Sequence, residues 1–136
     1  MPRIVALDVG DATIGVAATD ELGLAAHPAR TIRRTASVKA DLRTVEELLR
    51  ELDAEKVIVG LPLLASGEEG AQAAKVRDFF DRLARRIRIP AALWDESLST
   101  VEAEQMLLEA DVSRAKRRKV IDQMAAVVIL KGYLGD

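Results

Sequence analysis

The chain has 136 residues, of which 49% are hydrophobic and 31% are charged, and this balance predicts a single globular domain over residues 1–136. The absence of cysteine and the single histidine exclude disulfides, thiolate metal sites, cysteine nucleophiles and multi-histidine sites, while the net charge of −2 excludes a uniformly basic nucleic-acid-binding protein. No apolar stretch reaches the ~18 residues of a membrane span, and Asp8 interrupts the first apolar run too early for a secretory signal, so we expect a cytoplasmic protein.

The first part of the chain predicts three strands in an antiparallel meander. The apolar run at 4–9 is typical of a central strand that is covered on both faces. A turn at Gly10 and Asp11 leads to a second strand at 13–19, and this close spacing predicts a hairpin. The third strand, at 25–33, contains Pro28, which indicates a position at the edge of the sheet.

After the third strand the hydrophobic period changes to that of helices alternating with short buried strands. Ser37 is a plausible N-cap of the first helix, and Thr100 of the third. Strands that pair first and α/β units afterwards imply an α/β fold with a five-stranded mixed sheet flanked by helices. The predicted elements are helices at 38–52, 71–86, 100–109 and 120–133, strands at 56–60 and 90–94, and a loop at 61–70.

Three carboxylates occupy informative positions in this pattern. Asp8 lies inside an apolar strand, where a lone carboxylate costs several kcal/mol to bury unless it is paired or metal-bound; alternatively, it bonds the backbone of the next turn. Glu96 follows a strand, near the sheet edge where α/β proteins place their sites, or it lies in a solvated loop. Asp122 shares a helix face with Ala126 and Ile129, or it is favoured by the helix dipole about a turn from the start of its helix.

Together, the three carboxylates can converge on one site from the first strand, a later strand end and the last helix. Oxygen ligands alone suit hard cations such as Mg²⁺ or Mn²⁺. Two such ions ~3.5–4 Å apart can stabilise an in-line displacement at phosphorus, and the protein then needs no nucleophile of its own. We therefore expect a catalytic, metal-binding site formed by Asp8, Glu96 and Asp122.

A basic segment at 113–119 directly precedes Asp122 and contains five positive residues and no acidic one. We expect it to hold a nucleic-acid backbone beside the metal ions, and the alternative is a solvated loop between two helices. Gly10, Ser99 and Thr100 are weaker candidates for phosphate contacts, because glycine is common in turns and Thr100 is more simply a helix cap. The basic residues are Arg114, Lys116, Arg117, Arg118 and Lys119.

Five motifs in order make the chain resemble the YqgF (RuvX) family over nearly its whole length. Members of that family are described as Holliday junction resolvases and as pre-16S ribosomal RNA nucleases. The motifs are A-L-D-V-G-D-A-T-I-G-V-A at 6–17, V-G-L-P at 59–62, G-E-E-G-A-Q-A at 67–73, D-E-S-L-S-T at 95–100 and R-R-K-V-I-D-Q-M-A-A at 117–126. The resemblance implies an RNase H-like fold, a metal-dependent nuclease site and a role in maturing the 5′ end of 16S ribosomal RNA.

Residue by residue, the resemblance matches Asp8, Glu96 and Asp122 to the acidic residues of the family. The chain departs from the family at positions that are expected to contact the substrate. Ala12 and Thr13 stand where the family usually has basic residues, and Ser97 stands where it often has arginine. Residues 64–66 stand where the family usually has asparagine, methionine and aspartate. Metal binding is therefore the safer expectation, and substrate identity is the more open one.

Several functions remain open at this stage. Besides a nuclease that processes ribosomal RNA, the chain fits a junction resolvase, which would act as a homodimer on four-way DNA. A non-catalytic nucleic-acid-binding module would keep the fold and the basic segment but use the carboxylates only for stability. The D-V-G-D motif also resembles the first phosphate loop of sugar kinases and actin-like ATPases. Those proteins bind ATP between two RNase H-like domains, whereas this chain is long enough for only one.

Overall fold

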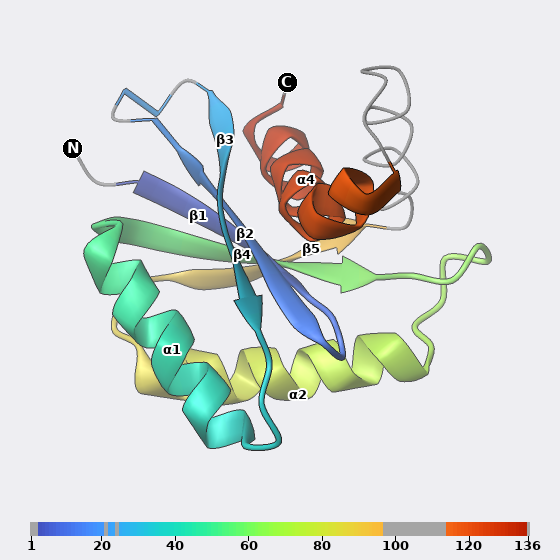
Figure 1. Cartoon of the computed structure of the whole chain (residues 1–136). Helices are drawn as coiled ribbons and strands as arrows, with labels where there is room; N and C mark the ends of the chain where they lie inside the picture. The colour runs from blue at the N-terminus through green and yellow to red at the C-terminus, as the bar shows by residue number, and fades with distance from the viewer. Residues whose placement is uncertain (1–2, 21, 24, 97–113, 136) are drawn as a thin grey trace.

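A five-stranded mixed sheet, in the order β3-β2-β1-β4-β5, forms the centre of the molecule (Figure 1). The structure, a computed structural model, describes residues 3–20, 22–23, 25–96 and 114–135, with the backbone alone for 96 and 114–123. The strands are β1 (Arg3–Val9), β2 (Thr13–Thr19), β3 (Ala26–Arg33), β4 (Ala54–Pro62) and β5 (Ala91–Glu96). The helices are α1 (Val38–Glu51), α2 (Ala71–Arg86) and α4 (Arg114–Leu134).

The strand directions confirm the predicted mixed sheet. β2 pairs antiparallel with both β1 and β3, which is the expected meander, and β4 and β5 run parallel to β1. Pro28 lies on β3, an outer strand, as its lack of an N–H donor predicted. Because β1, β4 and β5 are parallel, their carboxyl ends meet at one edge of the sheet, and this edge positions the candidate site.

Two apolar layers cover the two faces of the sheet. Helices α1 and α2 lie against one face, and α4 lies against the other (Figure 1). Strand residues divide between the layers with a period of two, because successive side chains point to opposite faces. On β1, Val5 and Leu7 belong to the α1/α2 layer, whereas Ala6 packs in the α4 layer with Ala17 and Ile58.

The first helix forms where its capping residue and its apolar stripe predict it. Ser37 caps α1, because its hydroxyl accepts the N–H of Ala40 at 3.1 Å. The buried face of α1 includes Leu42, Val45 and Leu49, and each of these side chains contributes about 1.5–3 kcal/mol through burial. Both α1 and α2 lie within a residue of the predicted boundaries.

The largest differences from the predicted boundaries are at β4, at the end of β5 and at the start of α4. β4 extends to Pro62 rather than ending at Gly60, because its last residues continue to pair with β5. Helix α4 begins at Arg114 rather than near residue 120, so residues 114–119 are helical and the alternative of a solvated loop does not hold for them. The predicted helix at 100–109 lies outside the described residues. Among the helices that the structure describes, none is long and apolar enough to cross a bilayer.

Candidate metal and nucleic-acid site

Asp8 lies near the carboxyl end of the central strand β1, between two glycines. On one side it pairs with Gly15 of β2. On the other side Leu7 pairs with Val59 of β4, so Gly60 comes next to Asp8. Neither glycine has a side chain, and both are buried, while Asp8 itself is partly buried. The strand alternation puts Asp8 on the α4 face, between two residues that have no side chain.

The direction of α4 follows from the contact at its carboxyl end. There the Lys56 ammonium, near the start of β4, donates to the Tyr133 hydroxyl. The other end of α4 therefore points toward the edge at which β1, β4 and β5 end. Asp122 lies one turn closer to that edge than Ala126, which packs in the same layer as Ala6. Asp8 is two strand residues closer to the edge than Ala6, which is a displacement similar to one helical turn. The backbones of Asp122 and Asp8 therefore lie at a similar distance from this edge.

The position at which α4 starts also excludes the alternative that Asp122 is a carboxylate stabilised by the helix dipole. The helix begins at Arg114, eight residues earlier, which places Asp122 in its third turn. The favourable effect of the helix dipole on a carboxylate is confined to the first turn. The interpretation of Asp122 as a carboxylate near the helix start is therefore wrong, and its shared face with Ala125 and Ala126, both buried, stands.

Glu96 is the last residue of β5 and reaches the same edge of the sheet. Its backbone pairs with Pro62, the last residue of β4. The position is in phase with Ala92, which packs in the α4 layer. The three predicted positions therefore come from three elements that meet at one edge. The side chains of Glu96 and Asp122 lie outside the described part, and among the described side chains no group of three or more potential ligands can hold a metal.

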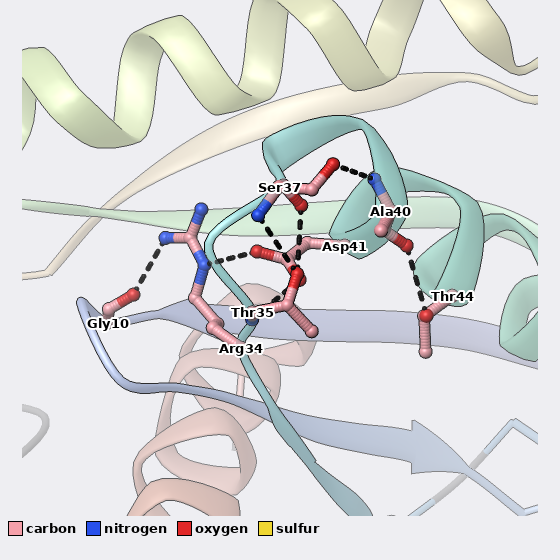
Figure 2. A network of polar contacts seen from close by, with 7 residues as sticks. All are labelled: Gly10, Arg34, Thr35, Ser37, Ala40, Asp41 and Thr44. Carbon is pink, nitrogen blue, oxygen red and sulfur yellow. Dashed lines mark hydrogen bonds and ion pairs between the residues drawn. The ribbon is translucent and has the colours of Figure 1, made fainter.

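A polar network, which the sequence analysis missed, fixes the turn that follows Asp8 (Figure 2). Arg34 donates from Nη1 to the Gly10 carbonyl at 2.9 Å and from its backbone N–H to the Ala12 carbonyl at 2.8 Å. Its Nε donates to Asp41 Oδ2 at 3.1 Å, and its guanidinium lies 5.1 Å from the centre of the Phe79 ring. Arg34 thereby connects the β1–β2 turn to both α1 and α2.

Asp41 is the buried anchor of this network, with only 1% of its surface exposed. Burial by itself raises the pKa of its carboxyl, but hydrogen bonds from the Thr35 N–H, Arg34 and the Thr35 hydroxyl together lower the pKa below its ordinary value. The Thr35 N–H and hydroxyl both lie 2.9 Å from Oδ1. The sequence carried a signal for this residue, because Asp41 is in phase with Val45 on the apolar face of α1.

The structure describes only some of the residues that were predicted to contact phosphate. The Gly10 N–H donates to the Thr13 carbonyl at 2.8 Å, so it closes the turn, and this engagement argues against the predicted phosphate contact. Ser99 and Thr100 lie outside the described residues. The basic residues from Arg114 to Lys119 form the first turns of α4, so they are distributed around a helix that leads directly to Asp122.

The loop at 63–70, which lies within the segment predicted as a loop at 61–70, is closed by its own backbone. Leu63 and Glu69 form a bridge, the Leu64 N–H donates to the Glu68 carbonyl at 2.8 Å, and the Gly67 N–H returns to the Leu64 carbonyl. Gly67 has a φ of +86°, which favours glycine. These contacts describe a tight turn between β4 and α2.

Comparisons with known proteins agree with this geometry. The family model for RuvX, described as Holliday junction resolvase, matches residues 2–136. A protein of Desulforamulus reducens named "Putative pre-16S rRNA nuclease" is 48% identical over 132 residues, covering 97% of this chain and 96% of that protein. A relative of the same name from Symbiobacterium thermophilum is 52% identical, covering 97% and 91%.

Among solved structures, RuvC of T. thermophilus in complex with Holliday junction substrate aligns with a TM-score of 0.58 at 14% identity. The alignment covers 99% of this chain and 97% of that one, and it confirms the predicted RNase H-like fold. The family match over almost every residue, together with relatives that share about half of their residues with it, shows that this chain belongs to the RuvX family.

Proposed function

We propose that this chain, a nuclease by its family, hydrolyses phosphodiester bonds with divalent metal ions, Mg²⁺ or Mn²⁺, held by Asp8, Glu96 and Asp122. The observation that carries the proposal is the position of Asp8. It is a partly buried carboxylate at the end of a central strand, between two buried glycines and facing the layer of α4. A carboxylate near the carboxyl end of a parallel strand, on the edge where α/β proteins place their sites, is suitably placed to bind a hard cation.

The three proposed ligands fit such ions in chemistry and in placement. All are carboxylates, and the chain offers no cysteine and one histidine, so a hard cation is the matching partner. A pair of such ions, when bound, would activate a water molecule and stabilise the charge that develops on the leaving oxygen. The task of the protein is then to hold three carboxylates at one edge, and the parallel pairing of β1, β4 and β5 and the direction of α4 support this arrangement.

The first turns of α4 supply the proposed contact with nucleic acid. Arg114, Lys116, Arg117, Arg118 and Lys119 precede Asp122 on one continuous helix. Their positive charges would attract the phosphate backbone and make binding fall steeply with salt concentration. Because phosphate contacts position a nucleic acid without reading its bases, this helix would place the backbone beside the carboxylates.

Ribosomal RNA precursor is the proposed substrate, and the cytoplasm the proposed location, because the relatives at 48% and 52% identity carry the name of a pre-16S rRNA nuclease. Cleavage of a four-way DNA junction is the second candidate, and the description of the family model supports it. A resolvase that makes symmetric cuts would need two copies of this chain, and therefore a homodimer.

The test is a cleavage assay on three substrates: a 5′ segment of precursor 16S ribosomal RNA, an unrelated single-stranded RNA and a four-way DNA junction. Each is incubated with Mn²⁺, with Mg²⁺ or with excess chelator. We expect metal-dependent cutting of the precursor segment and none with chelator. Paired symmetric nicks in the junction, by a protein that sediments as a dimer, would support the resolvase instead. Full cutting in chelator, or binding without any cutting, would refute the proposal.

A further inference from the structure

Trp94 is the only tryptophan of the chain, and 38% of its surface is exposed. Among the described residues, the other exposed large apolar side chains, Leu22 and Leu64, lie in connections between elements. Trp94 instead lies on β5, an outer strand of the sheet, where its backbone pairs with Gly60. The chain therefore carries a large aromatic ring, partly open to solvent, on a fixed element.

The indole ring of Trp94 is held by the carboxyl-terminal end of α4. Its centroid lies 5.7 Å from that of Tyr133, with the ring planes at 85°, an edge-to-face arrangement that aromatic pairs favour. A Cβ at Gly132 would lie only 3.1 Å from Nε1, so the ring lies against the helix where a side chain is absent. The Lys56 ammonium donates to the Tyr133 hydroxyl and lies 4.8 Å from the centre of its ring. Trp94 is therefore held in place before any ligand binds.

Trp94 lies in the same row of the sheet as Asp8. It pairs with Gly60, which stands next to Asp8 on β1, and its contacts with α4 put it on the face to which Asp8 belongs. The backbones of Trp94 and Asp8 are separated by two strand spacings, about 9–10 Å, and the residue between them has no side chain. Glu96 follows two residues later on β5, so Trp94 is close to two of the three proposed metal-ligand positions.

An exposed aromatic ring beside a site that cleaves phosphodiester bonds is suited to an unpaired nucleobase. Bases stack on aromatic side chains with little dependence on sequence, since every base has a π-face. The bases of a duplex are already stacked on each other, and freeing one of them costs energy. The basic turns at the start of α4 would attract the phosphate backbone, and a strand with a phosphate beside Asp8 can bring a neighbouring base to Trp94.

We propose that Trp94 is a stacking platform for an unpaired base of the nucleic acid, next to the phosphodiester bond that is cut. The inference rests on the proposed function, because it adds a base contact to that same site. Stacking on a ring that is already held in place costs little conformational freedom, so it favours single-stranded substrate over duplex. A single-stranded stretch of precursor RNA therefore fits this surface better than the paired arms of a four-way junction.

The first test uses the wild-type full chain at low salt in excess chelator, so that RNA is bound without being cut. The probe is an RNA of about 16 nucleotides and mixed sequence, either single-stranded or annealed to its complement. Because Trp94 is the only tryptophan, the tryptophan fluorescence of the chain reports on this residue alone. We expect single-stranded RNA to quench this fluorescence over the concentration range in which labelled RNA binds by anisotropy, and duplex RNA to bind with little quenching.

Two substitutions separate stacking from packing. Trp94→Leu keeps an apolar contact with α4 but has no ring, and we expect it to weaken single-stranded RNA binding by about 5- to 100-fold. Trp94→Phe keeps a ring and should recover most of this loss, while duplex binding should change by less than about 3-fold in both. Leu22→Ala is the matched control, because it removes an exposed apolar side chain between β2 and β3. Thermal unfolding checks that each variant folds, and the quenching test needs no variant.

The outcomes separate the platform from the nuclease site. Binding of single-stranded RNA without quenching, no binding at all, or equal affinity of wild type and Trp94→Leu would overturn the platform. Equal weakening by leucine and phenylalanine, or for single-stranded and duplex RNA, would show a structural effect and would also overturn it. The nuclease proposal is tested separately by metal-dependent cleavage. Quenching and ring-dependent binding by a chain that cuts no substrate would keep Trp94 as a base-binding residue and refute the nuclease proposal.

Discussion

Replacing Asp41 with asparagine should destabilise the protein strongly, although Asp41 lies in a helix outside the candidate site. Its carboxylate accepts hydrogen bonds from the Arg34 guanidinium, the Thr35 N–H and the Thr35 hydroxyl. Asparagine keeps the shape but loses the charge, and it presents an amide N–H₂ group to one of these donors. The Arg34 guanidinium, whose side chain is only 16% exposed, would then lose its buried counter-ion.

The magnitude follows from these contacts. A hydrogen bond to a charged group contributes about 1.5–3 kcal/mol, and breaking a buried ion pair from one side costs about 3–5 kcal/mol. Arg34 keeps its bond to the Gly10 carbonyl and its position over Phe79, so we expect the lower end, about 3 kcal/mol. In a domain of this size that loss lowers the melting temperature by about 10 °C.

The effect should depend on pH in one direction. The pKa of the Asp41 carboxyl is lowered in the folded protein, so the folded state binds a proton less readily than the unfolded chain. The contribution of Asp41 to stability is therefore complete above its unfolded pKa of about 3.8 and is lost as the pH falls through the lower folded value. The difference between wild type and Asp41→Asn should be constant from neutral pH to about pH 5 and shrink below pH 4.

Thermal and urea unfolding at a series of pH values measure both effects. Asp78→Asn is the control, because Asp78 pairs with Arg82 on the exposed face of α2, where an ion pair contributes little. A loss of less than about 0.5 kcal/mol in Asp41→Asn, or a difference that grows toward acid pH, would refute the assignment of Asp41 as the charged anchor of the turn.

Three further variants test other parts of the structure. Gly60→Val places a branched side chain beside Asp8, and we expect it to lower stability by about 1–3 kcal/mol and to weaken Mn²⁺ binding; unchanged Mn²⁺ affinity in a calorimetric titration would contradict a metal site next to that glycine. Gly67→Ala, at a φ of +86° in an exposed turn, should cost about 1–2 kcal/mol in unfolding and leave Mn²⁺ binding intact. Replacing Arg117, Arg118 and Lys119 together by alanine should reduce the salt dependence of nucleic-acid binding by about two to three units of slope, and an unchanged slope would remove the basic helix from the interface.

Much of the fold could be predicted because short-range patterns agree with the long-range arrangement. The apolar run of the first strand, its close spacing to the second strand and the edge signal of Pro28 predicted the antiparallel meander, and Ser37 predicted the start of α1. The two carboxylates at 8 and 122 stood out because each breaks an apolar pattern. Their positions near one edge of the sheet follow from pairing and from the direction of α4, which a single sequence does not specify.

The errors have equally specific causes. The last helix was predicted to start at residue 120, but arginine and lysine have good helix propensity, and residues 114–119 continue α4 back to Arg114. The role of Asp41 was missed because its partners, Arg34 and Thr35, precede the helix and meet it only after the chain turns from β3 into α1.

The most direct test of the nuclease site compares wild type with Asp8→Asn in Mn²⁺, measuring cleavage and binding of the same precursor RNA segment. Asparagine is nearly isosteric, so the fold and the basic helix should be preserved. We expect affinity for the RNA to stay within a few-fold, while the cleavage rate falls by about 100-fold or more because the carboxylate that binds the metal is lost. Cleavage by Asp8→Asn at the wild-type rate, with an unchanged metal requirement, would contradict the assignment of Asp8 to the catalytic site.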